Sequence, residues 1–193
     1  NLDALLLHNF DNFLENKKNL RKIFHIFLDL KKKKIIKKIG ISTYYPEKVH
    51  KYYKIFNFKI VQTPFNIFDQ RLSQSKIYRL NKFKNIEIHV RSIFLQGVLI
   101  KNNYPNFFNK WKVKLDKYFN FIENNNINAL NYCLYFVLSN KRINKIVIGF
   151  QNLSQLKEIF INSNRLNFNK KKNIYKDFKS KDLNLIIPSK WKI

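Results

Sequence analysis

The sequence predicts an α/β fold in which five parallel β-strands alternate with helices. Short apolar runs, many of them β-branched, recur along the chain, and segments with helical periodicity separate them. Parallel strands need a long crossover between them, so this alternation is typical of a parallel sheet with outer helices. The three glycines, Gly40, Gly97 and Gly149, lie within or shortly after these runs, where tight turns or a bound ligand need a backbone without side chains.

The predicted strands cover residues 4–7, 39–41, 60–61, 86–90 and 146–148. Apolar stripes at helical spacing run over residues 20–28, 49–56, 127–137 and 153–160. Pro46 fits the first turn of the second of these helices, and Asn152 with Gln155 resembles a capping box at the start of the last. Residues 170–193 are expected to form a short basic helix followed by an extended tail.

Composition bounds the class of protein. The chain has 193 residues, 45% of them hydrophobic, which is enough for one folded domain over residues 1–193. No run reaches the ~18 apolar residues of a membrane helix, and no signal peptide is evident, so a cytoplasmic protein without a membrane partner is expected. Its one cysteine, Cys133, excludes a disulfide framework and a thiolate metal cluster, and no metal site is predicted.

The charge allows a different function. Lys and Arg number 38 against 12 Asp and Glu, a net charge of +26, which also fits a basic nucleic-acid-binding or ribosomal protein. However, 32 Lys and 28 Asn stand against 2 Ala and 3 Gly, the bias of AT-rich codons. The lysines spread over every predicted helix without gathering on one face. A nucleic-acid partner is therefore the alternative and not the leading prediction.

Polar residues follow each predicted strand. Ligand sites of parallel α/β folds lie at the carboxyl ends of the strands, so these residues are expected to share one rim. They are His8 after the first strand, Ser42 and Thr43 after the second, Gln62 after the third, Arg91 and Ser92 after the fourth, and residues 149–152 after the fifth.

These segments resemble the aldo-keto reductase family. "LDALLLHN" resembles the family's fourth barrel strand with its catalytic histidine, and "KIGISTYYPEKV", "IVQTPFNIFDQR" and "IEIHVRSIFLQGVL" resemble strands five to seven. "IVIGFQNLSQL" resembles strand eight, and "IIPSKW" resembles the C-terminus of bacterial members. The resemblance implies a partial (β/α)8 TIM barrel, beginning at strand four and lacking three βα units. The absence of Met supports the expectation that the chain is a C-terminal portion.

The resemblance implies an NADP-dependent enzyme, with NAD as the other option, that reduces a small aldehyde or ketone by hydride transfer. His8 is implied to orient the substrate carbonyl. Ser42 and Gln62 are implied to hold the nicotinamide carboxamide, and Arg91 stands where many members have an aromatic residue that stacks on the nicotinamide.

The rest of the cofactor is implied to lie along the later loops. Ser92 and Gly97 are implied to lie at the pyrophosphate. The residues implied to bind the adenosine end are Gly149, Gln151, Asn152 and Gln155. Gln151 replaces a basic residue that often binds the 2′-phosphate, and the general-acid tyrosine of the family belongs to strands before His8. The chain alone is therefore expected to be inactive, and the resemblance does not specify its substrate or oligomeric state.

Overall fold

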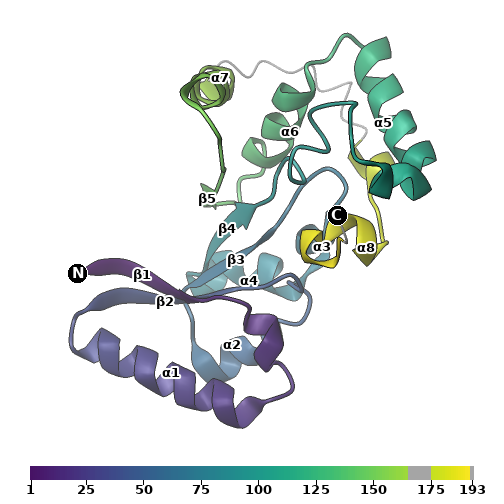
Figure 1. Ribbon diagram of the computed structural model, residues 1–193. Coiled ribbons are helices and arrows are strands. Elements are labelled where there is room, and N and C mark those ends of the chain that lie inside the picture. Colours follow the sequence, from purple (N-terminus) through teal and green to yellow (C-terminus); the bar gives the residue numbers. More distant parts are fainter. Residues whose placement is uncertain (165–174, 192–193) are drawn as a thin grey trace. The chain divides into compact units, whose positions relative to one another are not determined.

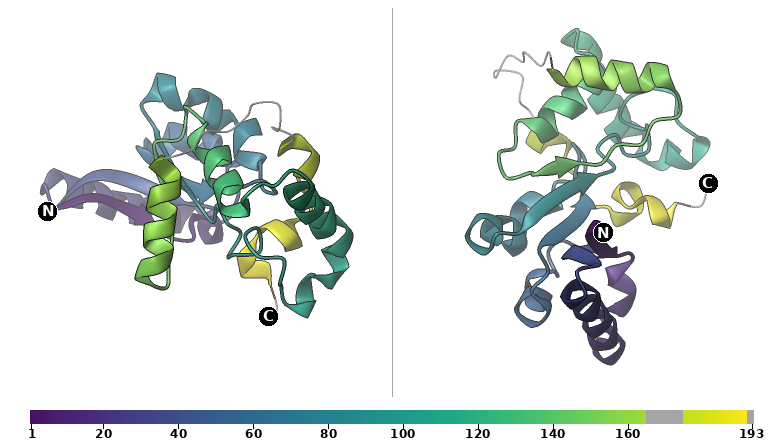
Figure 2. Two further views of the ribbon diagram at one scale, coloured as in Figure 1. Left: turned by 90° about the horizontal axis from the view of Figure 1, so that it is seen from above. Right: turned by 90° about the vertical axis from the view of Figure 1, so that its left-hand side faces the viewer.

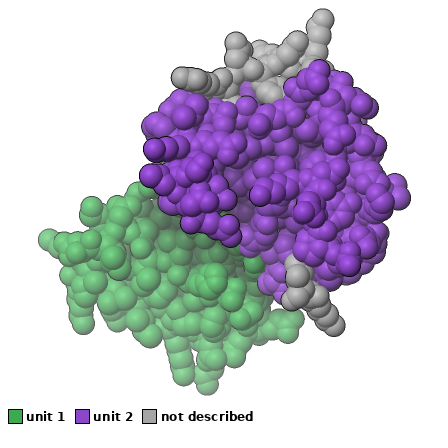
Figure 3. All heavy atoms as spheres, turned by 45° about the horizontal axis from the view of Figure 1, so that its top comes forward, with its two compact units in different colours: residues 1–64, 71–91, 142–146 green, residues 65–70, 92–141, 147–193 purple. Residues whose placement is uncertain are grey.

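The computed structural model describes residues 1–164 and 175–191. The chain divides into two compact units, which Figure 3 colours separately. Unit 1 comprises residues 1–64, 71–91 and 142–146, and unit 2 comprises residues 65–70, 92–141 and 147–193. Unit 1 contains the β-sheet, and the described part of unit 2 consists of helices and loops.

Unit 1 is built on a sheet of five parallel strands, which confirms the prediction. The strands are β1 (Leu2–Leu7), β2 (Ile36–Ser42), β3 (Ile60–Pro64), β4 (Glu87–Arg91) and β5 (Lys145–Ile146). They pair in sequential order, and every pair is parallel. β1 and β2 run side by side in Figure 1 and in the left-hand view of Figure 2. Each strand contains or overlaps the apolar run that predicted it.

Helices fill the connections between these strands. They are η1 (Phe10–Phe13), α1 (Lys17–Lys32), α2 (His50–Phe56), α3 (Arg71–Gln74) and α4 (Lys76–Lys84). The predicted stripe of α1 buries Leu20 and Phe24, and the Phe24 ring stacks on Phe56 of α2 with centroids 4.3 Å apart. In Figure 1, α1 and α2 lie together below β1 and β2. Pro46 does not begin α2, because residues 46–49 form a turn before it.

Unit 2 packs its helices around aromatic side chains. The described helices of unit 2 are η2 (Asn106–Trp111), α5 (Lys112–Asn124), α6 (Ala129–Leu138), α7 (Leu153–Asn164), η4 (Tyr175–Phe178), α8 (Leu183–Ile186) and η5 (Pro188–Lys190). Tyr118 of α5 is fully buried, and its ring lies 5.6 Å from that of Phe68 and 5.4 Å from that of Phe178. Its hydroxyl donates to the carbonyl of Leu99 at 3.0 Å. This core supports the loop that follows β4.

The C-terminal segment differs from the expected extended tail. Residues 175–191 wind into η4, α8 and η5. Asp182 begins α8 by accepting a hydrogen bond from the Asn184 backbone N–H at 2.9 Å, and Pro188 begins η5. The Trp191 indole then donates to the Leu185 carbonyl at 3.1 Å. These local bonds favour short helices over extended chain; residues 170–174 and 192–193 lie outside the described residues.

Candidate active site

The carboxyl ends of β1, β2 and β3 bring three predicted site residues into one row. Leu7 pairs with Ile41 and Ser42 pairs with Gln62, so His8, directly after β1, is level with Ser42 and Gln62. Side chains alternate along a strand, and Ile41 is fully buried on one side of the sheet. Ser42 and Gln62 therefore face the other side, where His8 is exposed and Gln62 is half-buried.

Ser42 and Gln62 form the most specific polar pair of this row. The Ser42 hydroxyl donates to the Gln62 side-chain carbonyl oxygen at 3.4 Å. The Thr43 backbone N–H donates to the Gln62 backbone carbonyl at 3.0 Å, which continues the pairing past the end of β2. A glutamine amide nitrogen is a donor and a serine oxygen is an acceptor. The pair thus presents a donor and an acceptor side by side, as recognition of a carboxamide requires.

Asp11 of η1 fixes the loop that follows Ser42. Its carboxylate accepts a hydrogen bond from the Thr43 hydroxyl and a second from the Tyr44 backbone N–H at 2.7 Å. The Thr43 oxygen in turn accepts from the Tyr45 backbone N–H at 2.9 Å. Thr43 is 1% exposed, and its hydroxyl is engaged in the hydrogen bonds of this turn.

Arg91 lies at the end of β4, next to the row. It pairs with Pro64, two residues beyond Gln62 on β3. Its guanidinium carbon lies 4.2 Å from the centre of the Tyr44 ring, a cation–π contact. Tyr44 follows β2 and Arg91 ends β4, so the two side chains meet across β3. The predicted residues of unit 1, His8, Ser42, Gln62 and Arg91, thus lie together at one edge of the sheet.

A charged network lies on the same face, toward the amino ends of the strands. The Lys38 ammonium donates to one Glu87 oxygen at 2.6 Å, and the His89 ring bonds the other at 3.0 Å. Mainly the Lys38 hydrogen bond, and secondly that of His89, lowers the pKa of the Glu87 carboxyl from its ordinary value. His89 pairs with Gln62 in register, so this network lies next to Gln62, on its side toward the amino ends of the strands.

In unit 2, the loop after β4 has a strained backbone. Ser92, Leu95 and Gln96 have φ values of 55°, 47° and 54°, and Gly97 has 91°. Left-handed conformations in residues other than glycine cost energy and gather at ligand clamps, and successive backbone N–H groups in such turns favour anions. The Asn66 amide donates to the Ser92 carbonyl at 3.0 Å and holds the start of the loop. Ser92 and Gly97 therefore share one loop, as predicted.

The start of α7 confirms the predicted capping box. The Asn152 side-chain oxygen accepts from the Gln155 backbone N–H at 2.9 Å, and the Gln155 side-chain oxygen accepts from the Gln151 backbone N–H at 2.8 Å. These two side-chain oxygens are thus committed to the helix end. Gly149 is exposed, and a Cβ placed on it would meet no atom within 4 Å. These four residues lie together at the surface of unit 2.

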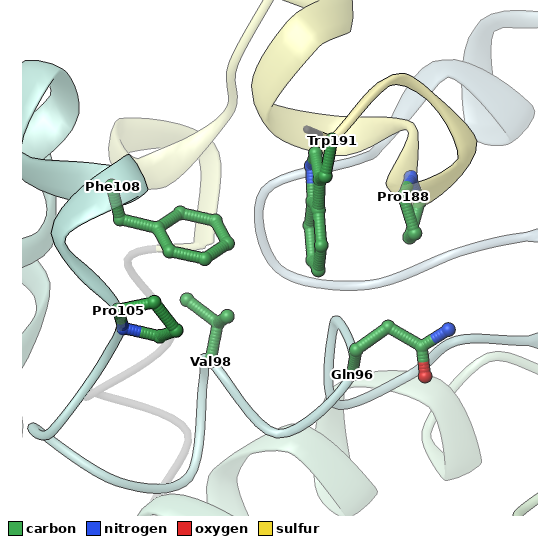
Figure 4. Close-up of a pocket in the computed structure, with 6 residues that line it drawn as sticks. All are labelled: Gln96, Val98, Pro105, Phe108, Pro188 and Trp191. Carbon is green, nitrogen blue, oxygen red and sulfur yellow. The ribbon is translucent and has the colours of Figure 1, made fainter. Parts of the chain in front are cut away.

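Unit 2 also holds an apolar pocket that the sequence did not predict (Figure 4). It has a volume of about 360 Å³ and is lined by Gln96, Val98, Pro105, Phe108, Pro188 and Trp191. The Phe108 and Trp191 rings meet edge to face, 4.8 Å apart. The available signal was a concentration of proline and aromatic residues in two segments that lie far apart along the chain, and only the fold brings them together.

Cys133 and two searches of the described residues bear on other kinds of site. Cys133 is buried, as predicted, and burial raises the pKa of its thiol to about 12, which makes it a poor nucleophile. In residues 1–164 and 175–191, no group of three or more His, Cys, Asp or Glu side chains is arranged to hold a metal ion. No helix in the same ranges is long and apolar enough to span a membrane.

The fold has relatives among solved structures. Aldo-keto reductase AKR11C1 from Bacillus halodurans, in its apo form, matches with a TM-score of 0.74 and 16% identity over 92% of this chain and 62% of that one. The glycerol dehydrogenase AKR11B4 from Gluconobacter oxydans matches with a TM-score of 0.66 and 14% identity over 96% and 59%. This chain therefore spans about three fifths of the length of these relatives. The similarity confirms the predicted α/β fold of a partial barrel.

The family follows from the sequence match. No curated protein sequence matches the chain. The sequence profile of the Aldo/keto reductase family, however, matches residues 1–181, from the start of the chain to the segment before α8. With that match over most of its length, this chain belongs to the Aldo/keto reductase family.

Proposed function

We propose that this chain serves, as a single functional domain, in an NAD(P)H-dependent oxidoreductase that reduces the carbonyl of a small aldehyde or ketone. NADPH is the proposed reductant and NADH the alternative. Enzymes of the family use NAD(P)H and act on small carbonyl compounds, which supports this assignment. The observation that carries it is the Ser42–Gln62 pair, level with His8 at the carboxyl ends of three parallel strands.

The nicotinamide end is assigned to unit 1. The donor of Gln62 and the acceptor of Ser42 fit a carboxamide, and both sit on rigid strands that can fix the orientation of the ring. When bound, the cofactor supplies a hydride. His8 then holds the carbonyl oxygen by a hydrogen bond, which stabilises the negative charge that develops there. The main proton donor is assigned to the tyrosine that the resemblance places before the histidine strand.

The phosphates and the adenosine end are assigned to unit 2. Ser92 and Gly97 are assigned to the pyrophosphate on the resemblance, because the Gly97 backbone N–H already donates to the Phe94 carbonyl at 3.0 Å within this left-handed loop. The N-terminus of α7 supplies backbone N–H groups and the positive end of a helix dipole. The residues assigned to this end are Gly149, Gln151, Asn152 and Gln155. The side-chain oxygens of Asn152 and Gln155 cap the helix, so contact with the nucleotide is left to backbone groups and amide nitrogens.

The test compares two variants of the completed enzyme, in which this chain is joined to the βα units that the resemblance places before His8. NADPH oxidation is followed with a panel of aldehydes, and nucleotide affinity is measured separately by fluorescence titration. His8→Ala should lower kcat by about 10²–10⁴-fold, the effect of losing a positioned oxyanion or proton partner. Its affinity for NADPH should stay within about twofold, because His8 is assigned to the substrate oxygen. Gln62→Ala should weaken NADPH binding by about tenfold, the scale of one hydrogen bond to a bound group.

His25→Ala is the control, since His25 is exposed on α1 and lies outside the proposed site. It should change neither kcat nor nucleotide affinity. An unchanged kcat in His8→Ala would leave His8 as an ordinary strand-end residue. Failure of the unsubstituted completed enzyme to bind either nucleotide would contradict the proposed function itself.

A further inference from the structure

The Arg91–Tyr44 stack places a fixed positive charge at the edge of the sheet that carries Gln62. Tyr44 comes from the loop after β2 and Arg91 from the end of β4, and β3 lies between these strands. The guanidinium carbon lies 4.2 Å from the centre of the ring. Arg91 is one strand over and two residues further along than Gln62, a diagonal neighbour at about 8 Å between Cα atoms.

The stack is anchored at both ends. The Tyr44 backbone N–H donates to Asp11 at 2.7 Å, and the preceding Thr43 N–H donates to the Gln62 carbonyl at 3.0 Å. Arg91 is held by its pairing with Pro64. Both side chains are half-buried, so water screens the charge less than at an exposed site. The Arg91 guanidinium is therefore held beside Ser42 and Gln62 and does not extend into solvent.

A fixed cation at this position distinguishes the two oxidation states of a nicotinamide. The oxidised ring carries a positive charge, whereas the reduced ring is neutral, and the rest of the nucleotide is the same in both. A nearby guanidinium therefore repels only the oxidised form. An aromatic side chain at the same position, as many members of the family have, lacks a net charge and does not make this distinction.

We propose that Arg91, positioned by its stack on Tyr44, makes this protein bind the reduced nicotinamide cofactor in preference to the oxidised one. This inference rests on the proposed function, because it requires the ring to lie at Ser42 and Gln62. This preference affects the direction in which the reaction runs. The reduced cofactor is retained until hydride leaves it, and the oxidised product is released more readily, which favours carbonyl reduction over alcohol oxidation.

The test measures Kd for NADPH and for NADP⁺ in the same completed enzyme, by fluorescence titration and by competition. Arg91→Gln removes the charge and should tighten NADP⁺ binding about five- to tenfold while NADPH affinity changes less than about twofold. Arg91→Lys keeps a positive charge and should retain most of the discrimination. Lys48→Gln is the matched control, because the exposed Lys48 ammonium lies 4.7 Å over the neighbouring Tyr45 ring but belongs to no part of the proposed site.

The outcomes separate the inference from the proposed function. An equal change of both Kd values in Arg91→Gln would overturn the inference, because Arg91 would then act through packing alone. Absence of any nucleotide binding by the unsubstituted completed enzyme would overturn both. Should Arg91→Gln fail to fold, Tyr44→Leu decides, because it keeps the charge but removes the ring that positions it: the ratio of the two Kd values should then shrink, and an unchanged ratio contradicts the inference.

Discussion

At the scale of single residues, Asp11 explains one departure of this chain from its family. Many members have asparagine after the serine of barrel strand five, where this chain has Thr43. The Thr43 side chain is buried and donates to Asp11, which lies three residues after His8. The carboxylate thereby links the turn that follows His8 to the loop that follows Ser42. The Thr43 side chain thus connects two segments of the candidate site.

Glu87 is predicted to make stability depend on acid pH. The hydrogen bond from Lys38, and then that from His89, lowers the pKa of its carboxyl below the ordinary 4.5. The unfolded chain therefore takes up a proton here before the folded chain does. The stabilisation is present above about pH 4.5 and is lost as pH falls through the lower folded pKa. Asp3, 4.0 Å from the Lys38 ammonium, is the other carboxylate that faces this group.

Urea unfolding at pH 7 and at about pH 3 tests this prediction. Glu87→Gln should lower the free energy of unfolding at pH 7 by about 1 kcal/mol, since the pair is partly exposed. The difference from the unsubstituted chain should shrink at the lower pH, where Glu87 is protonated in the unfolded state. Glu123→Gln, on an exposed part of α5, serves as the control. A constant difference across both pH values would contradict the assigned role of the Glu87 charge.

At the scale of elements, Gly40 is predicted to be required for packing within the sheet. A Cβ on Gly40 would lie 2.8 Å from the Ile60 Cβ and 2.9 Å from the Leu6 Cγ, atoms of the two flanking strands. Gly40→Ala should therefore lower the free energy of unfolding by about 1–3 kcal/mol, the usual cost of overpacking. Far-UV circular dichroism during urea unfolding measures it. Gly149→Ala should change stability by less than about 0.5 kcal/mol, because that Cβ meets no atom within 4 Å. Equal effects would disprove the packing argument.

β2, β3 and β4 were predictable because a strand buried on both faces is a run of apolar residues. The residues at which the strands begin and end were harder to predict. β2 begins at Ile36 and not at Ile39, because Glu87 pairs the charge of Lys38 and lets a polar residue enter the strand. β5 is shorter than predicted, since only Lys145 and Ile146 pair with β4. Polar residues inside strands need a partner elsewhere in the chain, which local sequence does not reveal.

In the candidate site, too, some features could be predicted from the sequence and others could not. The position of a residue at the end of a strand follows from the strand itself, so the row of His8, Ser42 and Gln62 could be predicted. The stack of Arg91 on Tyr44 depends on strand order and on side-chain rotamers. The apolar pocket depends on contact between two distant segments. Neither leaves a periodic pattern in the sequence.

At the scale of the whole molecule, the net charge of +26 opposes folding. With 12 carboxylates against 38 cationic side chains, most cations have no carboxylate to neutralise them. Pairs such as Lys32–Asp29 and Lys112–Asp116 lie largely in solvent and contribute little. Compacting so many like charges raises the energy of the folded state through self-repulsion. Salt shortens the Debye length from about 20 Å at 20 mM to about 6 Å at 300 mM, and so weakens that repulsion.

Raising NaCl from about 20 to 300 mM is therefore predicted to increase the melting temperature. A gain of about 1 kcal/mol corresponds to about 2–4 °C for a chain of this size. A triple variant tests the cause: Lys17→Gln, Lys18→Gln and Lys22→Gln remove three exposed cations near the N-terminus of α1, where the helix dipole already disfavours positive charge. This variant should melt higher at low salt and gain less from added salt. The matched Lys→Arg triple variant keeps the charge and should behave like the unsubstituted chain. A melting temperature that falls with salt would instead mean that ion pairs outweigh repulsion in this protein.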